Sequence, residues 1–113
     1  MLPFEPATNT VRMYTCGITP YDATHVGHAA TFLAYDVVQR RLRDIGYDTQ
    51  CVRNVTDVDD DILARARSLG VHYLDLAAAA LSTFEDDMSA LGLLRAHSEP
   101  RATSAISEVH ALV

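Results

Sequence analysis

The stretch that decides the fold is Val11-Arg12-Met13-Tyr14-Thr15-Cys16-Gly17-Ile18-Thr19-Pro20-Tyr21-Asp22-Ala23-Thr24-His25-Val26-Gly27-His28. Residues 11–16 form a short, largely apolar run that predicts a strand. Residues 17–24 contain a proline and a Tyr-Asp pair, which favour a loop. From about Gly27 to Asp44, apolar residues recur at helical spacing. A thiol therefore lies at a strand end, and two imidazoles lie at a helix start.

A second strand is predicted over Asp48–Asn54, after a plausible helix stop at Gly46. Strand, helix and strand within about 45 residues make a βαβ crossover, which implies a parallel pair. Open α/β sheets bind ligands in the crevice at the carboxyl ends of their strands. A helix N-terminus there offers free N–H groups and a positive dipole end, which suit a phosphate. We interpret the stretch as half of a site for ATP and a small substrate.

The remaining chain is predicted to be mostly helical. Met1 to Thr10 is a polar lead-in without periodicity. Further on we expect a short helix over Ile62–Leu69, an alanine-rich helix over Leu74–Leu91, and a last helix that starts at Ser98-Glu99-Pro100-Arg101. A doubly wound sheet needs more than two strands. The sequence therefore predicts the first part of a nucleotide-binding domain.

Composition sets limits on this interpretation. The 113 residues make one domain at most, with a formal net charge of -6 that gives no electrostatic reason to expect nucleic acid on this chain. All nine basic residues are arginines, so chemistry that needs a lysine ammonium must come from elsewhere. No run approaches the roughly 20 apolar residues of a membrane span, and no secretory leader is visible. Two cysteines do not make a disulfide framework, so a cytoplasmic location is expected.

The pattern His25-x-Gly27-His28 is the strongest chemical signal. Two imidazoles at a helix start can donate hydrogen bonds to phosphate oxygens as charge builds during attack at phosphorus. Gly27 would let the base of ATP approach the backbone closely. Two surface or capping histidines are the alternative, because the four-residue pattern alone is weak.

The two cysteines are predicted to have different roles. Cys16 lies at the mouth of the loop, where a thiolate could be a nucleophile or a zinc ligand. A zinc site needs about four ligands, and the chain shows no CxxC or paired His/Cys cluster. Cys51 lies within the second predicted strand and is expected to be a small core hydrophobe.

An acidic segment, Asn54-Val55-Thr56-Asp57-Val58-Asp59-Asp60, closes the second strand. Consecutive acids could hold Mg²⁺. We expect Asp60 and Asp61 to form a solvated helix cap instead. Thr56 and Asp57 lie closer to the strand end and are expected to face the crevice.

Together these residues resemble the cysteinyl-tRNA synthetase family of class I adenylate-forming enzymes, from about Val11 to Leu112. His25-Val26-Gly27-His28 is similar to the family's HIGH signature, Cys16-Gly17 to its opening Cys-Gly, and 54–60 to its Asn-Ile-Thr-Asp-Ile-Asp-Asp segment. Residues 87–92 and 99–103 also match. The resemblance implies an α/β fold: the N-terminal portion, residues 1–113, of a Rossmann-like (HUP-type) catalytic domain with parallel strands and a following helical segment.

The family has two branches. One charges tRNA(Cys) with cysteine, and the other, in mycothiol biosynthesis, joins cysteine to the amine of glucosaminyl-inositol. The stretch from Gly17 to Thr31 is more similar to the mycothiol branch. The stretch Glu99-Pro100-Arg101-Ala102-Thr103 is more similar to the tRNA branch. We favour the mycothiol branch and keep the tRNA branch as the alternative.

The resemblance also implies roles for individual residues. ATP, with Mg²⁺, would be bound by Thr24, His25, Gly27 and His28, with His25 and His28 as the catalytic pair. L-cysteine and its adenylate would be bound by Cys16, Gly17, Thr19 and Thr56, with Cys16 as one ligand of Zn²⁺. Zinc binds a thiolate better than a hydroxyl, which would select cysteine over serine. The reaction implied is attack of the cysteine carboxylate on ATP, followed by acyl transfer to the acceptor.

Two other functions stay open at this point. A non-catalytic module would bind adenine nucleotides without dependence on cysteine. Another nucleotidyl transferase would show no thiol preference. The remaining zinc ligands and the KMSKS loop of the family are not found in residues 1–113, so we expect the chain to be inactive without the other half of the catalytic domain.

Overall fold

The computed structural model describes residues 4–113, and the predicted βαβ unit is present in them. Among these residues the elements are β1 (Thr10–Ile18), α1 (Val26–Asp44), β2 (Asp48–Val55), α2 (Asp60–Leu69), α3 (Tyr73–Ala90), the 3-10 turn η1 (Thr103–Ala105) and α4 (Ile106–Leu112). The strands are parallel, as expected, with Thr10 opposite Asp48 and Ile18 opposite Val55. Of the expected lead-in, residues 1–3 lie outside the described part of the chain, and 4–9 form neither helix nor strand.

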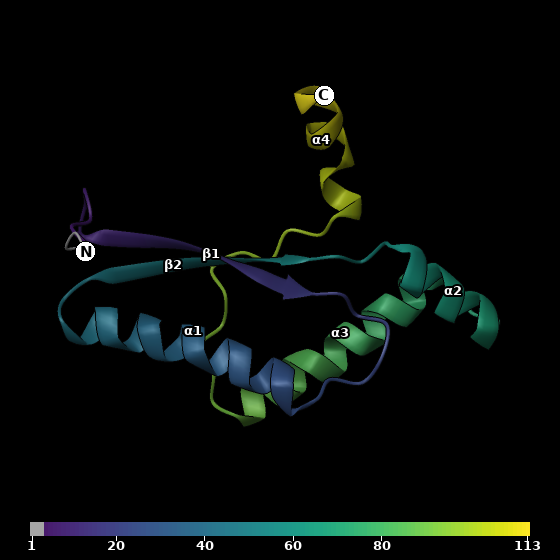
Figure 1. The fold of residues 1–113 in the computed structure, drawn as a ribbon, viewed down its shortest axis with the longest axis horizontal. Helices are drawn as coiled ribbons and strands as arrows, with labels where there is room; N and C mark the ends of the chain where they lie inside the picture. The colour runs from purple at the N-terminus through teal and green to yellow at the C-terminus, as the bar shows by residue number, and fades with distance from the viewer. Residues whose placement is uncertain (1–3) are drawn as a thin grey trace.

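The helices α1 and α3 lie together on one side of the two strands, whereas α4 projects from the other side (Figure 1). The core between strands and helices is apolar, and its ring pair Phe32 and Phe84 meets edge to face at 5.2 Å between centroids. This contact joins α1 to α3. The buried cluster consists of Ile18, Phe32, Val55, Leu81, Phe84 and Met88.

The short helix α2 ends at Leu69, as its sequence predicts, but begins at Asp60, two residues before the expected start at Ile62. Asp59 is the N-cap and accepts a hydrogen bond from the amide of Ile62, and Gly70 ends the helix with φ of 69°. Asp60 and Asp61 occupy the first turn, where they interact favourably with the helix dipole. No helix within residues 4–113 is long and apolar enough to cross a membrane.

The expected start of a last helix at Ser98–Arg101 is wrong. Ser98 and Arg101 form parallel bridges with Val52 and Val55 on the free edge of β2. The amide of Val55 donates to the carbonyl of Pro100 at 2.9 Å. Proline lacks an N–H group and disfavours helix at the residue before it, so this segment satisfies the strand edge and helix begins only at Thr103. The two named strands thus gain a short third neighbour, residues 97–102.

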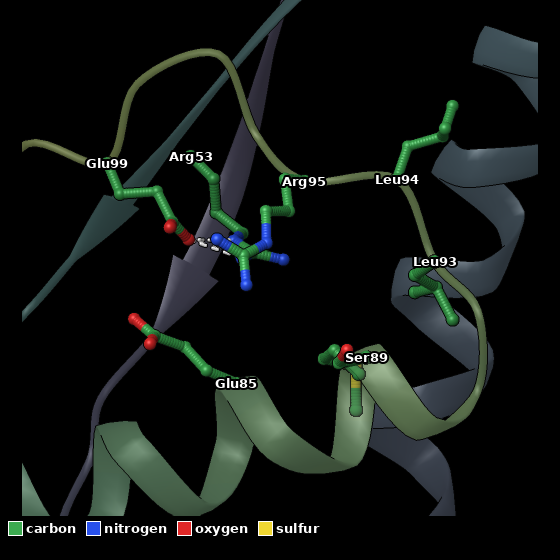
Figure 2. Close-up of a pocket in the computed structure, with 8 residues that line it drawn as sticks. Arg53, Glu85, Ser89, Leu93, Leu94, Arg95 and Glu99 are labelled. Atoms are coloured by element: carbon green, nitrogen blue, oxygen red, sulfur yellow. Dashed lines mark hydrogen bonds and ion pairs between the residues drawn. The ribbon is translucent and has the colours of Figure 1, made fainter.

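This third segment is held by an ion pair beneath it. Oε1 of Glu99 accepts hydrogen bonds from both Nε, at 2.8 Å, and Nη2 of the Arg53 guanidinium. The guanidinium also lies 5.0 Å from the ring centroids of both Phe32 and Phe84. Figure 2 shows the pair at the edge of a concavity of about 160 Å³, with the side chain of Glu85 on the opposite side. The ion pair therefore ties residues 97–102 to the apolar core.

We expect Glu99→Gln to lower the free energy of unfolding by about 1.5–3 kcal/mol, the range for a hydrogen bond to a charged group. The reason is that the Arg53 side chain is only 11% exposed and would lose its ionised partner. Urea denaturation measures the change. Asp44→Asn is the matched control, because the Arg41–Asp44 pair is exposed on both sides and should contribute less than about 1 kcal/mol. Equal effects of the two substitutions would contradict this account.

Candidate functional site

The start of α1 is built by the two histidines of the sequence motif. His25 is the N-cap, and its Nδ1 atom accepts a hydrogen bond from the amide of Gly27 at 3.1 Å. In return, Nδ1 of His28 accepts from the amide of His25 at 3.3 Å. The two rings lie 4.0 Å apart between centroids. This is a reciprocal capping box in which imidazoles replace the usual hydroxyl and carboxylate.

The capping box also assigns the protons on both rings. A nitrogen that accepts a hydrogen bond carries no proton, so each neutral imidazole carries its proton on Nε2. The motif was expected to offer free helix amides to a phosphate. In the structure the amides of His25, Gly27 and His28 have partners within the motif, so of its four amides that of Val26 is the one without a hydrogen bond in residues 4–113. The two Nε2–H groups are therefore the polar donors that the rings keep for a ligand.

Both rings line a concavity of about 470 Å³ at the carboxyl end of β1. Of the residues predicted to bind substrate, Gly17, Thr19 and Thr24 also line it, but Cys16 and Thr56 do not. The structure thus brings five of the predicted site residues to one cavity. The full lining is Gly17, Ile18, Thr19, Tyr21, Asp22, Ala23, Thr24, His25, His28, Asp59 and Asp61.

Gly27 does not line the cavity, and its role in the structure is steric. A Cβ atom built on it would lie 2.9 Å from both Cε1 and Nδ1 of His25. Real Cβ atoms do not approach that closely, so any other residue would displace the ring from its capping position. The glycine therefore permits the capping geometry of His25, a reason that sequence reasoning did not find.

Cys16 and Gly17 lie where the pairing of β1 with β2 breaks. The register shifts between Thr15 and Ile18, and the amide of Gly17 donates to the side-chain carbonyl of Asn54 at 3.0 Å. Cys16 is exposed. It follows the strand alternation in which Arg12 and Tyr14 are exposed while Thr15 is buried. The thiol therefore adjoins the cavity through Gly17 without lining it.

Thr56 and Asp57 differ from expectation. Thr56 is half-buried just after β2, with its hydroxyl accepting from Nδ2 of Asn54 at 3.2 Å. Asp57 was expected to face the crevice, and this is wrong. It is 3% exposed, and its two oxygens accept from the amide and hydroxyl of Thr103 at 2.9 and 2.6 Å. A buried carboxylate needs such partners, so Asp57 fixes the turn that leads into α4.

The residues described here do not by themselves form a zinc centre. Zinc takes about four ligands, and within residues 4–113 no three His, Cys, Asp or Glu side chains gather as a metal site. Cys16 offers one exposed thiol. Cys51, by contrast, is 5% exposed and belongs to the core, as predicted.

Sequence reasoning missed several residues around the cavity. Asp61 was assigned to a solvated cap, yet it lines the cavity together with Asp59 and Asp22. Asn54 joins Gly17 to Thr56 and was recognised only as part of a motif. Asp87, on α3, accepts a hydrogen bond from the hydroxyl of Thr24 at 2.8 Å. The Gly17–Asn54 and Thr24–Asp87 bonds connect positions 37 and 63 residues apart, which no local pattern could reveal.

The parallel strand pair with its helices has the Rossmann-like fold of class I synthetases, and comparison with known proteins identifies the family. Residues 3–113 match the family described as "tRNA synthetases class I (C) catalytic domain". The chain belongs to this family. In three dimensions it is similar to methionyl-tRNA synthetase of Mycobacterium tuberculosis in complex with methionyl-adenylate, with a TM-score of 0.72 and 26% identity over 76% of this chain and 17% of that one.

Two kinds of relative match at similar identity. An L-cysteine:1D-myo-inositol 2-amino-2-deoxy-alpha-D-glucopyranoside ligase of Mycobacterium ulcerans is 51% identical over 98% of this chain and 27% of its own length. A cysteine–tRNA ligase of Azotobacter vinelandii is 48% identical over 97% of this chain and 24% of its own length. The chain thus spans about a quarter of the length of these relatives.

We expect His25→Ala to lower the free energy of unfolding by about 0.5–2 kcal/mol, because the substitution removes an N-cap. His25→Asn should restore most of that stability, since asparagine is a preferred N-cap. Urea denaturation of the three proteins measures both changes. Equal stability of His25→Ala and the unsubstituted chain would show that the cap contributes nothing.

Gly17→Ala should be far more disruptive than its size suggests. A Cβ atom at this position would lie 1.5 Å from the carbonyl oxygen of Asn54 and 3.0 Å from Cγ of Arg53, so β1 and β2 must separate locally. We expect a loss of at least about 2 kcal/mol, seen as a lower urea midpoint. Gly46→Ala is the control for replacing a glycine, because nothing lies within 4 Å of its Cβ position, although its φ of 98° adds some strain. A smaller loss at Gly17 than at Gly46 would contradict the steric argument.

Proposed function

We propose that residues 1–113 form the HIGH-motif portion of an ATP-dependent cysteine-activating ligase, in which the cavity beside α1 receives the triphosphate of ATP. The observation that carries the proposal is that two imidazoles line this cavity with their Nδ1 atoms already bonded, which leaves Nε2–H of each ring as the donor for a ligand. Both rings are held by the backbone of α1 before any ligand arrives. Donors fixed in this way stabilise developing charge without reorganising during the reaction.

The charge of the cavity indicates in which form ATP binds. Three carboxylates, Asp22, Asp59 and Asp61, share the lining with two neutral imidazoles. A bare triphosphate would be repelled by these carboxylates, whereas its Mg²⁺ complex carries less negative charge. Mg²⁺–ATP is therefore the proposed substrate form. His25 and His28 orient the phosphates and stabilise their charge, and Gly27 keeps the His25 ring in place.

The proposed cysteine pocket adjoins the cavity at the break in strand pairing. Gly17 and Thr19 line the cavity, while Asn54 holds the Thr56 hydroxyl as an acceptor. The Thr56 proton is thus left to donate to a substrate oxygen. We propose Cys16 as one ligand of a zinc ion whose other ligands lie outside residues 4–113; when bound, zinc would select a substrate thiolate. The free state of both cysteines agrees with the proposed cytoplasmic location.

The acceptor is proposed to be the amine of glucosaminyl-inositol. The stretch from Gly17 to Thr31 supports this choice, and a relative named for that reaction is 51% identical. The net charge of -6 also gives no attraction for a polyanion. The second candidate is tRNA(Cys), which is supported by the stretch 99–103 and by the 48% identical cysteine–tRNA ligase.

The test uses substitutions that keep the capping box but remove the rings. His25→Asn keeps the N-cap, and His28→Gln keeps the back-bond, since glutamine serves that position in capping boxes. We expect each to lower cysteine-dependent ATP–pyrophosphate exchange by about 10²-fold or more, mainly in kcat. The assay uses a chimera in which this chain replaces its 111 matching residues of the M. ulcerans relative. The chain alone is expected to show no exchange.

His72→Asn is the matched control. His72 caps α3 as His25 caps α1, with Nδ1 accepting from the amide of Leu74 at 3.3 Å, but it does not line the cavity. Its substitution should leave exchange unchanged. Full exchange in His25→Asn and His28→Gln would refute the proposal. Supplying glucosaminyl-inositol or tRNA(Cys) to the active chimera then separates the two acceptors.

A further inference from the structure

Among residues 4–113, a single hydrogen bond links the loop between β1 and α1 to a distant element, in addition to the packing of its buried residue Pro20. Among the described residues, the hydrogen bonds of residues 19–24 are local, with Tyr21 bonding to Thr19 and Ala23 to Asp22, except for one. The exception is the hydroxyl of Thr24, which donates to Oδ2 of Asp87 at 2.8 Å. Thr24 immediately precedes the N-cap His25, so this bond holds the backbone next to the two imidazoles.

Asp87 occupies a position that its own helix disfavours. It lies in the last turn of α3, where its carbonyl accepts from the amide of Leu91. The last turn of α3 contains no basic residue. A carboxylate near a helix C-terminus interacts unfavourably with the helix dipole, and Glu85 and Asp86 add like charge nearby. The helix itself therefore gives no reason for an aspartate here, whereas the bond to Thr24 does.

The helix that carries Asp87, α3, packs against the core. The neighbouring residue Met88 is 6% exposed, and Phe84, one turn earlier, is fully buried against Phe32 of α1. The Asp87 carboxylate therefore belongs to a well-packed helix. The loop to which it binds makes no other hydrogen bond to a distant residue within residues 4–113. The hydroxyl proton of Thr24 is also committed to Asp87, so it is not available to a phosphate.

We propose that Asp87 is a positioning residue for the nucleotide site: through Thr24 it holds the start of α1 so that both imidazoles stay at the cavity. The hydrogen bond orders the loop even when no ligand is bound. Only its expected effect on ATP affinity rests on the function proposed above. The loop order and ATP affinity can therefore be measured separately.

The experiment compares Thr24→Val, Asp87→Ala and the double substitution with the unsubstituted chain. The first readout is the set of ¹⁵N order parameters of the amides of residues 21–27 without ligand, which should fall from rigid toward flexible values in both single variants. The second readout is the affinity for Mg²⁺–ATP by calorimetry, expected to weaken about 2- to 10-fold, as one hydrogen bond allows. The double variant should be no worse than either single one.

Two further variants separate positioning from general stability. Thr24→Ser keeps the hydroxyl and should restore both readouts. Asp86→Ala removes the adjacent exposed carboxylate, for which no bond to the loop is found in residues 4–113, and should change neither. Unchanged order parameters in Thr24→Val and Asp87→Ala, or multiplying effects in the double variant, overturn the positioning role. If the order parameters fall in both variants but the unsubstituted chain binds no Mg²⁺–ATP, the positioning of the loop by Asp87 is supported. That result would count against the proposed function instead.

Discussion

The first amides of a helix need hydrogen-bond partners, and in α1 two of these partners are the imidazoles of the candidate site. The bonds to Nδ1 of His25 and His28 satisfy two amides of the first turn and its cap. The same bonds fix each ring's proton on Nε2 and hold the rings 4.0 Å apart. Because Gly27 alone leaves room for the first ring, the motif specifies local backbone structure and ligand chemistry together.

The second constraint is the break in the strand pair. A regular ladder would have placed Cys16 and Gly17 in register with β2, but the pairing shifts after Thr15. The side chain of Asn54 replaces the missing ladder bond to Gly17 and holds the hydroxyl of Thr56 with its other end. One amide side chain thus organises both halves of the proposed cysteine pocket. Breaks of this kind re-aim side chains beside functional sites.

Much of this arrangement follows from local sequence, and the rest does not for physical reasons. The βαβ unit and the helix stop at Gly46 are visible in periodicity and turn chemistry, because both act within a few residues. The pairing of Ser98–Arg101 with β2 was missed because the segment that bonds to the free edge of this strand lies some 45 residues further along the chain. Asp57 was misplaced for a similar reason. Its oxygens bind Thr103, 46 residues further on.

If the cavity receives ATP as proposed, its electrostatics require charged groups beyond its own lining. The chain contains no lysine, and none of its arginines is among the residues that line the cavity. The neutral imidazoles supply hydrogen-bond donors, but three carboxylates stand in the same lining. Stabilising a triphosphate whose negative charge increases during attack therefore requires positive charge from a source other than this cavity wall. Mg²⁺ provides one such source, and the relatives, about four times as long as this chain, have room for others. In the proposed site, the imidazoles would therefore orient the triphosphate by hydrogen bonding, whereas Mg²⁺ and further residues would supply the charge that binds it.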